Sequence, residues 1–164
     1  ESMEICFVAD NNYKRFLNDY SPEKLSAIGQ GEIVDEQGEV VGKHPGYTNY
    51  TIGQRKGLGL SNPEPRYVSE INPVLNQITI GKKDSLEAKH CNVSQANWLV
   101  PGLIFPLMIQ AQIRYNSPVV EAKVYRNAEQ ISVQFSEPQI AITSGQSIVF
   151  YDDDIILGGG VIEK

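Results

Sequence analysis

Short runs of alternating apolar and polar residues, separated by turn-forming residues, are the feature that most constrains how this sequence can fold. Residues 122–125 (Ala-Lys-Val-Tyr) and 131–135 (Ile-Ser-Val-Gln-Phe) alternate as half-buried strands do. Similar segments recur at roughly the 8–12-residue spacing that is typical of barrels and sandwiches. The predicted strands are residues 91–98, 107–115, 119–126, 130–135, 147–151 and 155–162. We therefore expect residues 91–164 to form a β-barrel.

The sequence before this barrel predicts a smaller β-domain, residues 29–90. The turn residues Gln37-Gly38 and the segment 72–76 each separate two strand-like runs, which is the pattern of a β-hairpin. The predicted hairpins pair residues 31–35 with 40–42, and residues 67–71 with 77–81. A glycine-rich segment, residues 46–61, lies between them. A domain boundary near residue 90 follows from this change of pattern.

One stretch has helical periodicity instead. Its apolar side chains recur at i, i+3, i+4 and i+7 and form one stripe: Tyr13, Phe16, Leu17 and Tyr20. Asp10 is a candidate N-cap. Pro22 is expected to end the helix, because proline lacks a backbone N–H and disfavours helix in the residue before it. The sequence thus predicts a single short helix within residues 1–28, and a mainly β protein overall.

Charge limits the possible partners. The 164 residues include 14 Lys and Arg against 20 Asp and Glu, a net charge of −6. Because general binding to nucleic acid depends on neutralising phosphates, an acidic chain can bind RNA only through local patches or through other parts of the protein. We expect weak and strongly salt-sensitive binding to RNA.

Targeting signals are not found in this sequence. No apolar run approaches the ~20 residues needed to span a bilayer, and the acidic start is unlike a signal peptide. A cytoplasmic protein without a membrane partner is the expectation. The start at Glu1, which runs directly into the apolar segment 5–8, is expected to be a cut inside a longer protein.

The two cysteines are too far apart in sequence to predict a disulfide framework or a metal site. Cys91 opens a predicted strand, so we expect it to be buried. Cys6 has two interpretations. A structural cysteine is the more common fate of a free thiol, whereas a nucleophile needs a thiolate, which a helix N-terminus or the nearby Lys14 and Arg15 would favour.

A basic, glycine-rich block covers residues 50–59 (Tyr-Thr-Ile-Gly-Gln-Arg-Lys-Gly-Leu-Gly). Glycine allows another molecule to approach the backbone, and Arg55 and Lys56 could contact phosphates. The alternative is a tight loop with a solvated basic tip. No strand–loop–helix unit surrounds the block, so it is not a nucleotide-binding fingerprint.

Three further residues are candidates for RNA contacts. Arg114 can pair with a phosphate and Tyr115 can stack on an unpaired base; equally, Tyr115 could end its strand in the core with Arg114 at the surface. Gln146 lies in a turn and could hydrogen-bond a base, although a solvated glutamine is the simpler interpretation.

The remaining motifs favour structural roles. The isolated His44 and His90 are expected to be surface or hydrogen-bonded histidines. The glycine run 158–160 predicts a bulge or close packing. Residues 152–154 (Asp-Asp-Asp) predict a hairpin turn, because a metal site would need further ligands that the sequence does not show. We therefore expect no metal site.

Together these segments follow one another in the order and spacing of the tRNA-specific 2-thiouridylases, which the chain resembles along essentially its whole length. That family has the older name tRNA (5-methylaminomethyl-2-thiouridylate)-methyltransferase. The resemblance implies a central β-domain and a C-terminal six-stranded β-barrel similar to elongation-factor domain 2, preceded by an ATP-pyrophosphatase domain. The matching segments are residues 2–7, 44–46, 50–59, 114–115, 145–151 and 157–162.

The resemblance also implies a reaction. The family uses ATP to adenylate the C2 oxygen of the wobble uridine in tRNA, and sulfur then replaces the activated oxygen to give 2-thiouridine. The sulfur comes from a sulfur-relay carrier protein and is held as a persulfide on a cysteine that matches Cys6. Arg114, Tyr115 and Gln146 match the family's tRNA contacts.

The sequence departs from the family in one respect. It contains no S-G-G-x-D-S loop for ATP, so the resemblance places ATP in an N-terminal domain outside this sequence and implies that the chain alone is inactive. The competing hypothesis is a non-enzymatic β-barrel module that binds RNA or protein and has a structural Cys6. The reading frame upstream would separate the two, because only the enzyme needs the ATP loop.

Overall fold

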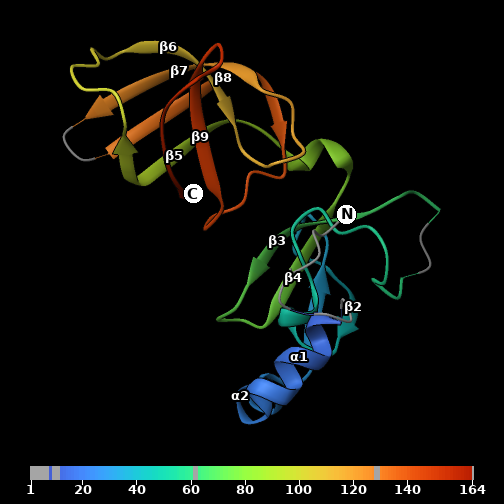
Figure 1. Ribbon diagram of the computed structural model, residues 1–164. Coiled ribbons are helices and arrows are strands. Elements are labelled where there is room, and N and C mark those ends of the chain that lie inside the picture. The colour runs from blue at the N-terminus through green and yellow to red at the C-terminus, as the bar shows by residue number, and fades with distance from the viewer. Residues whose placement is uncertain (1–7, 9–11, 61–62, 128–129, 164) are drawn as a thin grey trace. The chain divides into compact units, whose positions relative to one another are not determined.

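The computed structural model describes residues 8, 12–60, 63–127 and 130–163. The chain divides into two compact units, Glu1–Leu86 (the N-terminal unit) and Glu87–Lys164 (the barrel unit). Each unit has its own sheet and its own hydrophobic core. Figure 1 shows both α-helices at the start of the chain, whereas the barrel unit consists of strands and their connections.

Two helices open the described chain, α1 (Tyr13–Tyr20) and α2 (Pro22–Ile28). The prediction of a single helix was wrong because Pro22 both ends α1 and begins α2. Proline is favourable in the first turn of a helix, where its missing N–H would have no intrahelical partner. The sequence signal that stops one helix is therefore also compatible with starting the next.

The start of α1 differs from the prediction. Asn12 is the N-cap, and its side-chain oxygen accepts a hydrogen bond from the backbone N–H of Arg15 at 3.0 Å. The predicted cap, Asp10, lies outside the described residues. Tyr20, the last member of the predicted apolar stripe, is 79% exposed and stacks on Phe16, so the stripe is buried only in part.

A four-stranded sheet with the order β2-β1-β4-β3 forms the N-terminal unit. Both predicted hairpins are confirmed, since β1 pairs antiparallel with β2 and β3 pairs antiparallel with β4. The two hairpins join through a parallel pairing of β1 with β4. The strands are β1 (Gly31–Val34), β2 (Val40–His44), β3 (Tyr67–Asn72) and β4 (Gln77–Gly81), with 3-10 turns η1 (Tyr47–Asn49) and η2 (Lys83–Leu86). The core residues are Ile33, Leu58, Val68, Ile78 and Ile80.

Asn76, in the turn between β3 and β4, connects three elements of this unit. Its Nδ2 donates to the carbonyl of Ile28 at the end of α2 (2.8 Å), and its Oδ1 accepts from the N–H of Tyr47 in η1 (3.2 Å). Its own carbonyl accepts from the N–H of Glu32 in β1 (3.3 Å). These hydrogen bonds attach the helical segment to the sheet.

His44 ends β2 and is only 2% exposed. Its Nδ1 accepts a hydrogen bond from the backbone N–H of Gly46 at 3.0 Å, and its ring meets Tyr50 edge-on. Its Nε2 has no hydrogen-bond partner within the described part of the chain. The expectation of a surface or fully hydrogen-bonded histidine was therefore wrong, because the ring is buried and bonded at one nitrogen only. His90, by contrast, is exposed.

Acidification should destabilise the N-terminal unit. Burial lowers the pKa of His44, although nearby main-chain hydrogen bonds oppose this effect. The unfolded chain then takes up a proton at a higher pH than the folded chain, so the free energy of unfolding falls as the pH drops below about 6.5. We expect the amides of β1 to exchange faster at pH 5.5 than the intrinsic pH dependence of amide exchange alone predicts.

The matched variants are His44→Gln and His90→Gln. The first should remove most of this pH dependence of β1, and the second should leave it unchanged, because His90 belongs to the barrel unit. Equal pH dependence in His44→Gln and in the unsubstituted chain would contradict the assignment.

The barrel unit is a closed barrel with the strand order β10-β5-β8-β7-β6-β9, and every pairing is antiparallel. All six predicted strands are present. The strands are β5 (Glu87–Trp98), β6 (Leu107–Gln112), β7 (Val120–Asn127), β8 (Gln130–Ile140), β9 (Ser147–Asp152) and β10 (Ile155–Glu163). The largest fully buried side chains of its core are Phe135, Phe150, Ile131, Ile148 and Ile162.

The glycine run in β10 has the packing role predicted for it. The register shifts on both sides of Gly158 and Gly159, where β10 pairs with β9 and with β5. A Cβ on Gly159 would lie 2.6 Å from the carbonyl oxygen of Ile148, and a Cβ on Gly160 would lie 2.5 Å from Cγ1 of Val93. Side chains at these positions would push β10 away from its neighbours.

Candidate nucleic-acid interface

Two loops meet at one end of the barrel and form the candidate site. We call them the two-loop surface: residues 113–119 between β6 and β7, and residues 141–146 between β8 and β9. They share this end because β6 finishes beside the beginning of β9, where Gln112 pairs with Val149. The surface contains Arg114, Tyr115 and Gln146, three of the residues predicted to contact RNA.

Arg114 links the two loops. Its Nε donates to Oε1 of Gln146 at 3.1 Å, and its Nη2 donates to the carbonyl of Ala141 and to Oγ1 of Thr143, the latter at 3.4 Å. The prediction that Arg114 ends a strand was wrong, because β6 stops at Gln112 and the chain turns there. The main-chain N–H and carbonyl of Arg114 are both bonded to Ser117 within the turn, so they are not available to the sheet.

The second loop contains a strained residue at this contact. Ala141 has φ 55°, a conformation that costs a non-glycine residue roughly 1–2 kcal/mol. Its carbonyl accepts from Arg114 and also from the hydroxyl of Thr143 at 2.9 Å. These hydrogen bonds help to offset the cost of the backbone conformation.

Tyr115 is 83% exposed, although it adjoins the half-buried Arg114. The turn beneath it is closed by Ser117, whose N–H donates to the carbonyl of Arg114 (3.0 Å) and whose Oγ accepts from the N–H of Arg114 (3.1 Å). The alternative in which the tyrosine lies in the core with the arginine at the surface is therefore wrong. The ring is open on the surface, which is the requirement for stacking on a base.

Gln146 is half-buried and bonded, not a freely solvated glutamine. Its main-chain carbonyl accepts from the N–H of Ile162 in β10 at 2.8 Å, and its side-chain oxygen accepts from Arg114. The first bond fixes the main chain of this residue, and the second orients its side chain with Nε2 still available. No partner for that Nε2 occurs within the ranges that the structure describes.

The charge on this surface is local. Arg114 is the only charged residue in segment 98–120 of the sequence, and segment 138–151 has none. The two-loop surface therefore has a single positive charge and no negative charge of its own, although the chain as a whole is acidic. This is the kind of local patch that RNA contact by an acidic protein requires.

The basic block 50–59 belongs to the N-terminal unit and is not part of the two-loop surface. Backbone hydrogen bonds pair Gly53 and Gln54 with Val68 of β3. The Gln54 side chain closes the loop by accepting from the N–H of Thr51 (3.1 Å) and donating to the carbonyl of Lys56 (2.9 Å).

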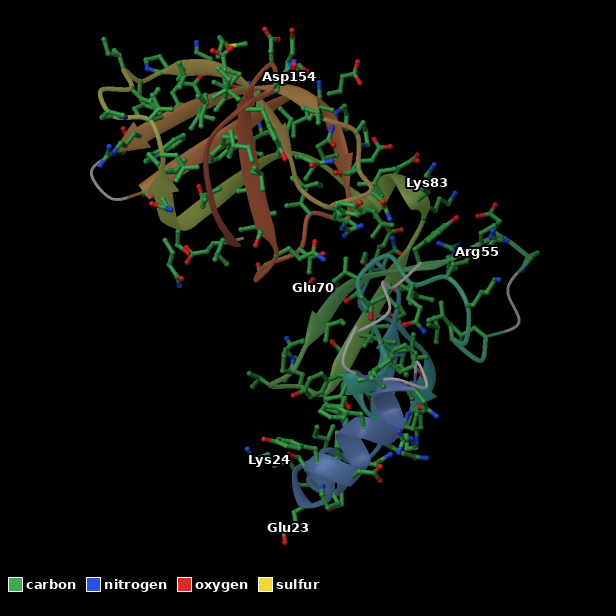
Figure 2. All side chains as sticks on the ribbon, in the orientation of Figure 1. Glu23, Lys24, Arg55, Glu70, Lys83 and Asp154 are labelled. Atoms are coloured by element: carbon green, nitrogen blue, oxygen red, sulfur yellow. The ribbon has the colours of Figure 1, made fainter. Side chains whose placement is uncertain are left out.

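Arg55 and Lys56 are exposed at the tip of this loop, between the half-buried Ile52 and the buried Leu58. Figure 2 shows Arg55 on this loop, beside the sheet. The arrangement agrees with a tight loop that has a basic tip. Contact with phosphate by these two residues stays a prediction.

The structure describes only one of the two cysteines. Cys6, the predicted persulfide cysteine, lies outside the described residues. Cys91 is buried in β5, as expected, and its burial raises the pKa of the thiol to about 11. A thiol of this kind cannot serve as a nucleophile near neutral pH.

Cys91 should resist alkylation while the chain is folded. With a pKa of about 11, roughly one thiol in a thousand is ionised at pH 8. In a Cys6→Ser variant we expect no modification by iodoacetamide within an hour, measured by mass spectrometry, and complete modification in denaturant. Rapid labelling of the folded variant would show that Cys91 is accessible and contradict its structural role.

The described part of the chain has no group of three or more His, Cys, Asp or Glu residues placed to hold a metal ion. Nor does it have a helix of the length and apolar character needed to cross a bilayer. The glycine block pairs with β3 and does not lead into a helix. Its residues therefore do not fit a phosphate-binding loop for ATP.

Comparison with known proteins agrees with this architecture. Residues 14–82 match the tRNA methyl transferase PRC-barrel domain, and residues 88–162 match the aminomethyltransferase beta-barrel domain. The chain is 46% identical over 166 residues to the tRNA-specific 2-thiouridylase MnmA of Symbiobacterium thermophilum, covering 100% of the chain and 42% of that protein.

Two other relatives with the same name give a similar result. The protein of Gloeothece citriformis is 42% identical over 167 residues, and that of Clostridioides difficile is 43% identical over 166 residues. The alignments cover 100% of the chain, and 46% and 45% of these relatives. The chain thus spans less than half the length of the curated relatives it matches.

The fold and the two domain matches define the class: a β-rich chain that combines a PRC-barrel domain with an aminomethyltransferase-type β-barrel. With relatives of one name matched along its whole length, the chain belongs to the tRNA-specific 2-thiouridylase family.

Proposed function

We propose that this chain is the tRNA-facing part of a cytoplasmic tRNA-uridine 2-sulfurtransferase. The observation that carries the proposal is the two-loop surface, on which an open tyrosine ring adjoins the only positive charge of both loops. Membership of the thiouridylase family supports tRNA as the ligand of this surface.

Each of the three residues has a distinct proposed contact. Tyr115 stacks on an unpaired base, and Gln146 donates from Nε2 to a base or a phosphate. Arg114 already uses Nε and Nη2 to join the loops, so Nη1 is the donor that we assign to a phosphate. Arg114 therefore both shapes the surface and contributes its charge, and Arg55 and Lys56 are secondary phosphate contacts.

The chemistry that we propose for the complete enzyme requires an activated oxygen and a sulfur nucleophile. The C2 oxygen of uridine is a poor leaving group, and adenylation by ATP makes it a good one. Because the described residues do not fit an ATP site, we assign ATP to a domain outside this sequence. Cys6 receives the terminal sulfur of a carrier persulfide by thiol–persulfide exchange, and this sulfur attacks C2 and displaces AMP. A second thiol, which we assign to the part of the enzyme outside this sequence, then attacks the sulfur of Cys6, so that 2-thiouridine leaves and a disulfide forms.

Tyr115→Ala should weaken binding of a tRNA with uridine at the wobble position. Because base–aromatic stacking contributes about 1–3 kcal/mol, we expect a loss of roughly 5- to 150-fold in affinity, measured by fluorescence anisotropy at fixed salt. The slope of affinity against salt should be unchanged, because no charge is removed.

Tyr20→Ala is the matched control, since Tyr20 is similarly exposed (79%) but lies in α1. Arg114→Ala should weaken binding and also flatten the salt slope. Full affinity in both Tyr115→Ala and Arg114→Ala would refute tRNA binding at this surface.

Cys6→Ser in the complete enzyme should abolish 2-thiouridine formation and leave tRNA affinity intact, because the residue is proposed to hold sulfur and not RNA. Cys91→Ser is the control and should retain activity, since Cys91 is a buried core residue. The readout is thionucleoside content by mass spectrometry after nuclease digestion. Thiolation by Cys6→Ser would mean that another residue holds the sulfur.

A further inference from the structure

Gln112 is the last residue of β6, directly before the loop that presents Tyr115. Its Nε2 donates to the carbonyl of Ser117 at 2.8 Å and to the carbonyl of Tyr115 at 3.3 Å. Its Oε1 accepts from the hydroxyl of Tyr151 in β9 at 3.3 Å. One side chain therefore ties both sides of the turn to the barrel wall.

This attachment matters because Tyr115 makes little packing contact of its own. A ring that is 83% exposed cannot hold its loop in place by burial. Ile113 anchors the start of the loop in the core and Arg114 bonds the second loop. The tip at Tyr115 has to be held through its main chain, and the carbonyl of Tyr115 is one of the two groups that Gln112 holds. Fixing a binding loop beforehand reduces the entropy lost on association.

We propose that Gln112, supported by Tyr151, is a positioning residue that holds the 113–119 loop so that the Tyr115 ring is presented before RNA binds. The inference rests on the proposed function of the two-loop surface. Gln112 itself makes no contact with RNA in this proposal, and it affects tRNA affinity only through the position of Tyr115.

Glutamine suits this position for a chemical reason. Its amide donates to the loop carbonyls and accepts from Tyr151 at the same time. Methionine has a similar length but no N–H donor, and an ionised glutamate can accept but not donate. Gln112→Met therefore removes the hydrogen bonds and keeps most of the volume, which limits damage to the barrel.

The first experiment measures tRNA affinity of the 164-residue chain in a double-mutant cycle. Gln112→Met should lower affinity about five- to tenfold, the effect of losing one to two ordinary hydrogen bonds, with an unchanged salt slope. In the Tyr115→Ala background the same substitution should have no further effect. Tyr151→Phe should cause a smaller loss.

Gln110→Met is the matched control, because Gln110 is a half-buried glutamine on the same strand and lies outside the loop contacts. It should leave affinity unchanged. An equal loss from Gln112→Met with and without Tyr115 would overturn the inference, since Gln112 would then act by another route. Full affinity in Gln112→Met, where Tyr115→Ala does weaken binding, would overturn it as well.

The second experiment needs no RNA. Amide hydrogen exchange at Arg114 and Ser117, whose N–H groups are bonded within the turn, should be about tenfold faster in Gln112→Met than in Gln110→Met. If Tyr115→Ala and Arg114→Ala both leave tRNA affinity unchanged, the proposed function fails and exchange alone decides the inference. Faster exchange then supports the positioning role, and equal exchange overturns it.

Discussion

Closure of the barrel through β9 is the constraint on which the candidate site depends. β9 pairs with β10 on one side and with β6 on the other, and these two ladders close the sheet. Closure leaves no unpaired edge and fixes where every strand ends. It brings the loop after β6 to the same end as the loop before β9, so that Arg114 can bond the second loop. The small residues of β10 make this closure possible, because Gly159 leaves room for the main chain of Ile148.

On the two-loop surface, the residues that fix the loops differ from the residue that is left open to a ligand. The half-buried side chains of Arg114 and Gln112 hold the two loops in place, and the exposed ring of Tyr115 remains free for a ligand. Because a single arginine provides the charge, selectivity has to come from stacking and from directed hydrogen bonds more than from attraction to phosphate. On the proposed function, such a surface would favour a presented base over ordinary duplex RNA, which offers phosphates but no unpaired ring.

The parts of the structure that follow local patterns were predictable, and those that depend on register were not. Both hairpins and all six barrel strands follow from alternation, because one face of each strand is buried. The second helix was missed because Pro22 signals a stop as strongly as a start. Neither the burial of His44 nor the exposure of Tyr115 can be deduced from neighbouring residues. The link from Gln112 to Tyr151 requires knowing that β6 lies beside β9, which no short motif encodes.

The hairpin turn at residues 152–154 places three aspartates in a row at one end of the barrel. It joins β9 to β10 at the end opposite the two-loop surface, and Figure 2 shows Asp154 at that end. A six-residue strand such as β9 is roughly 20 Å long, about twice the Debye length at physiological salt. The three aspartates are therefore too distant to cancel the charge of Arg114, yet they repel any polyanion that approaches them directly. A polyanion is therefore disfavoured at this turn, whatever binds at the other end of the barrel.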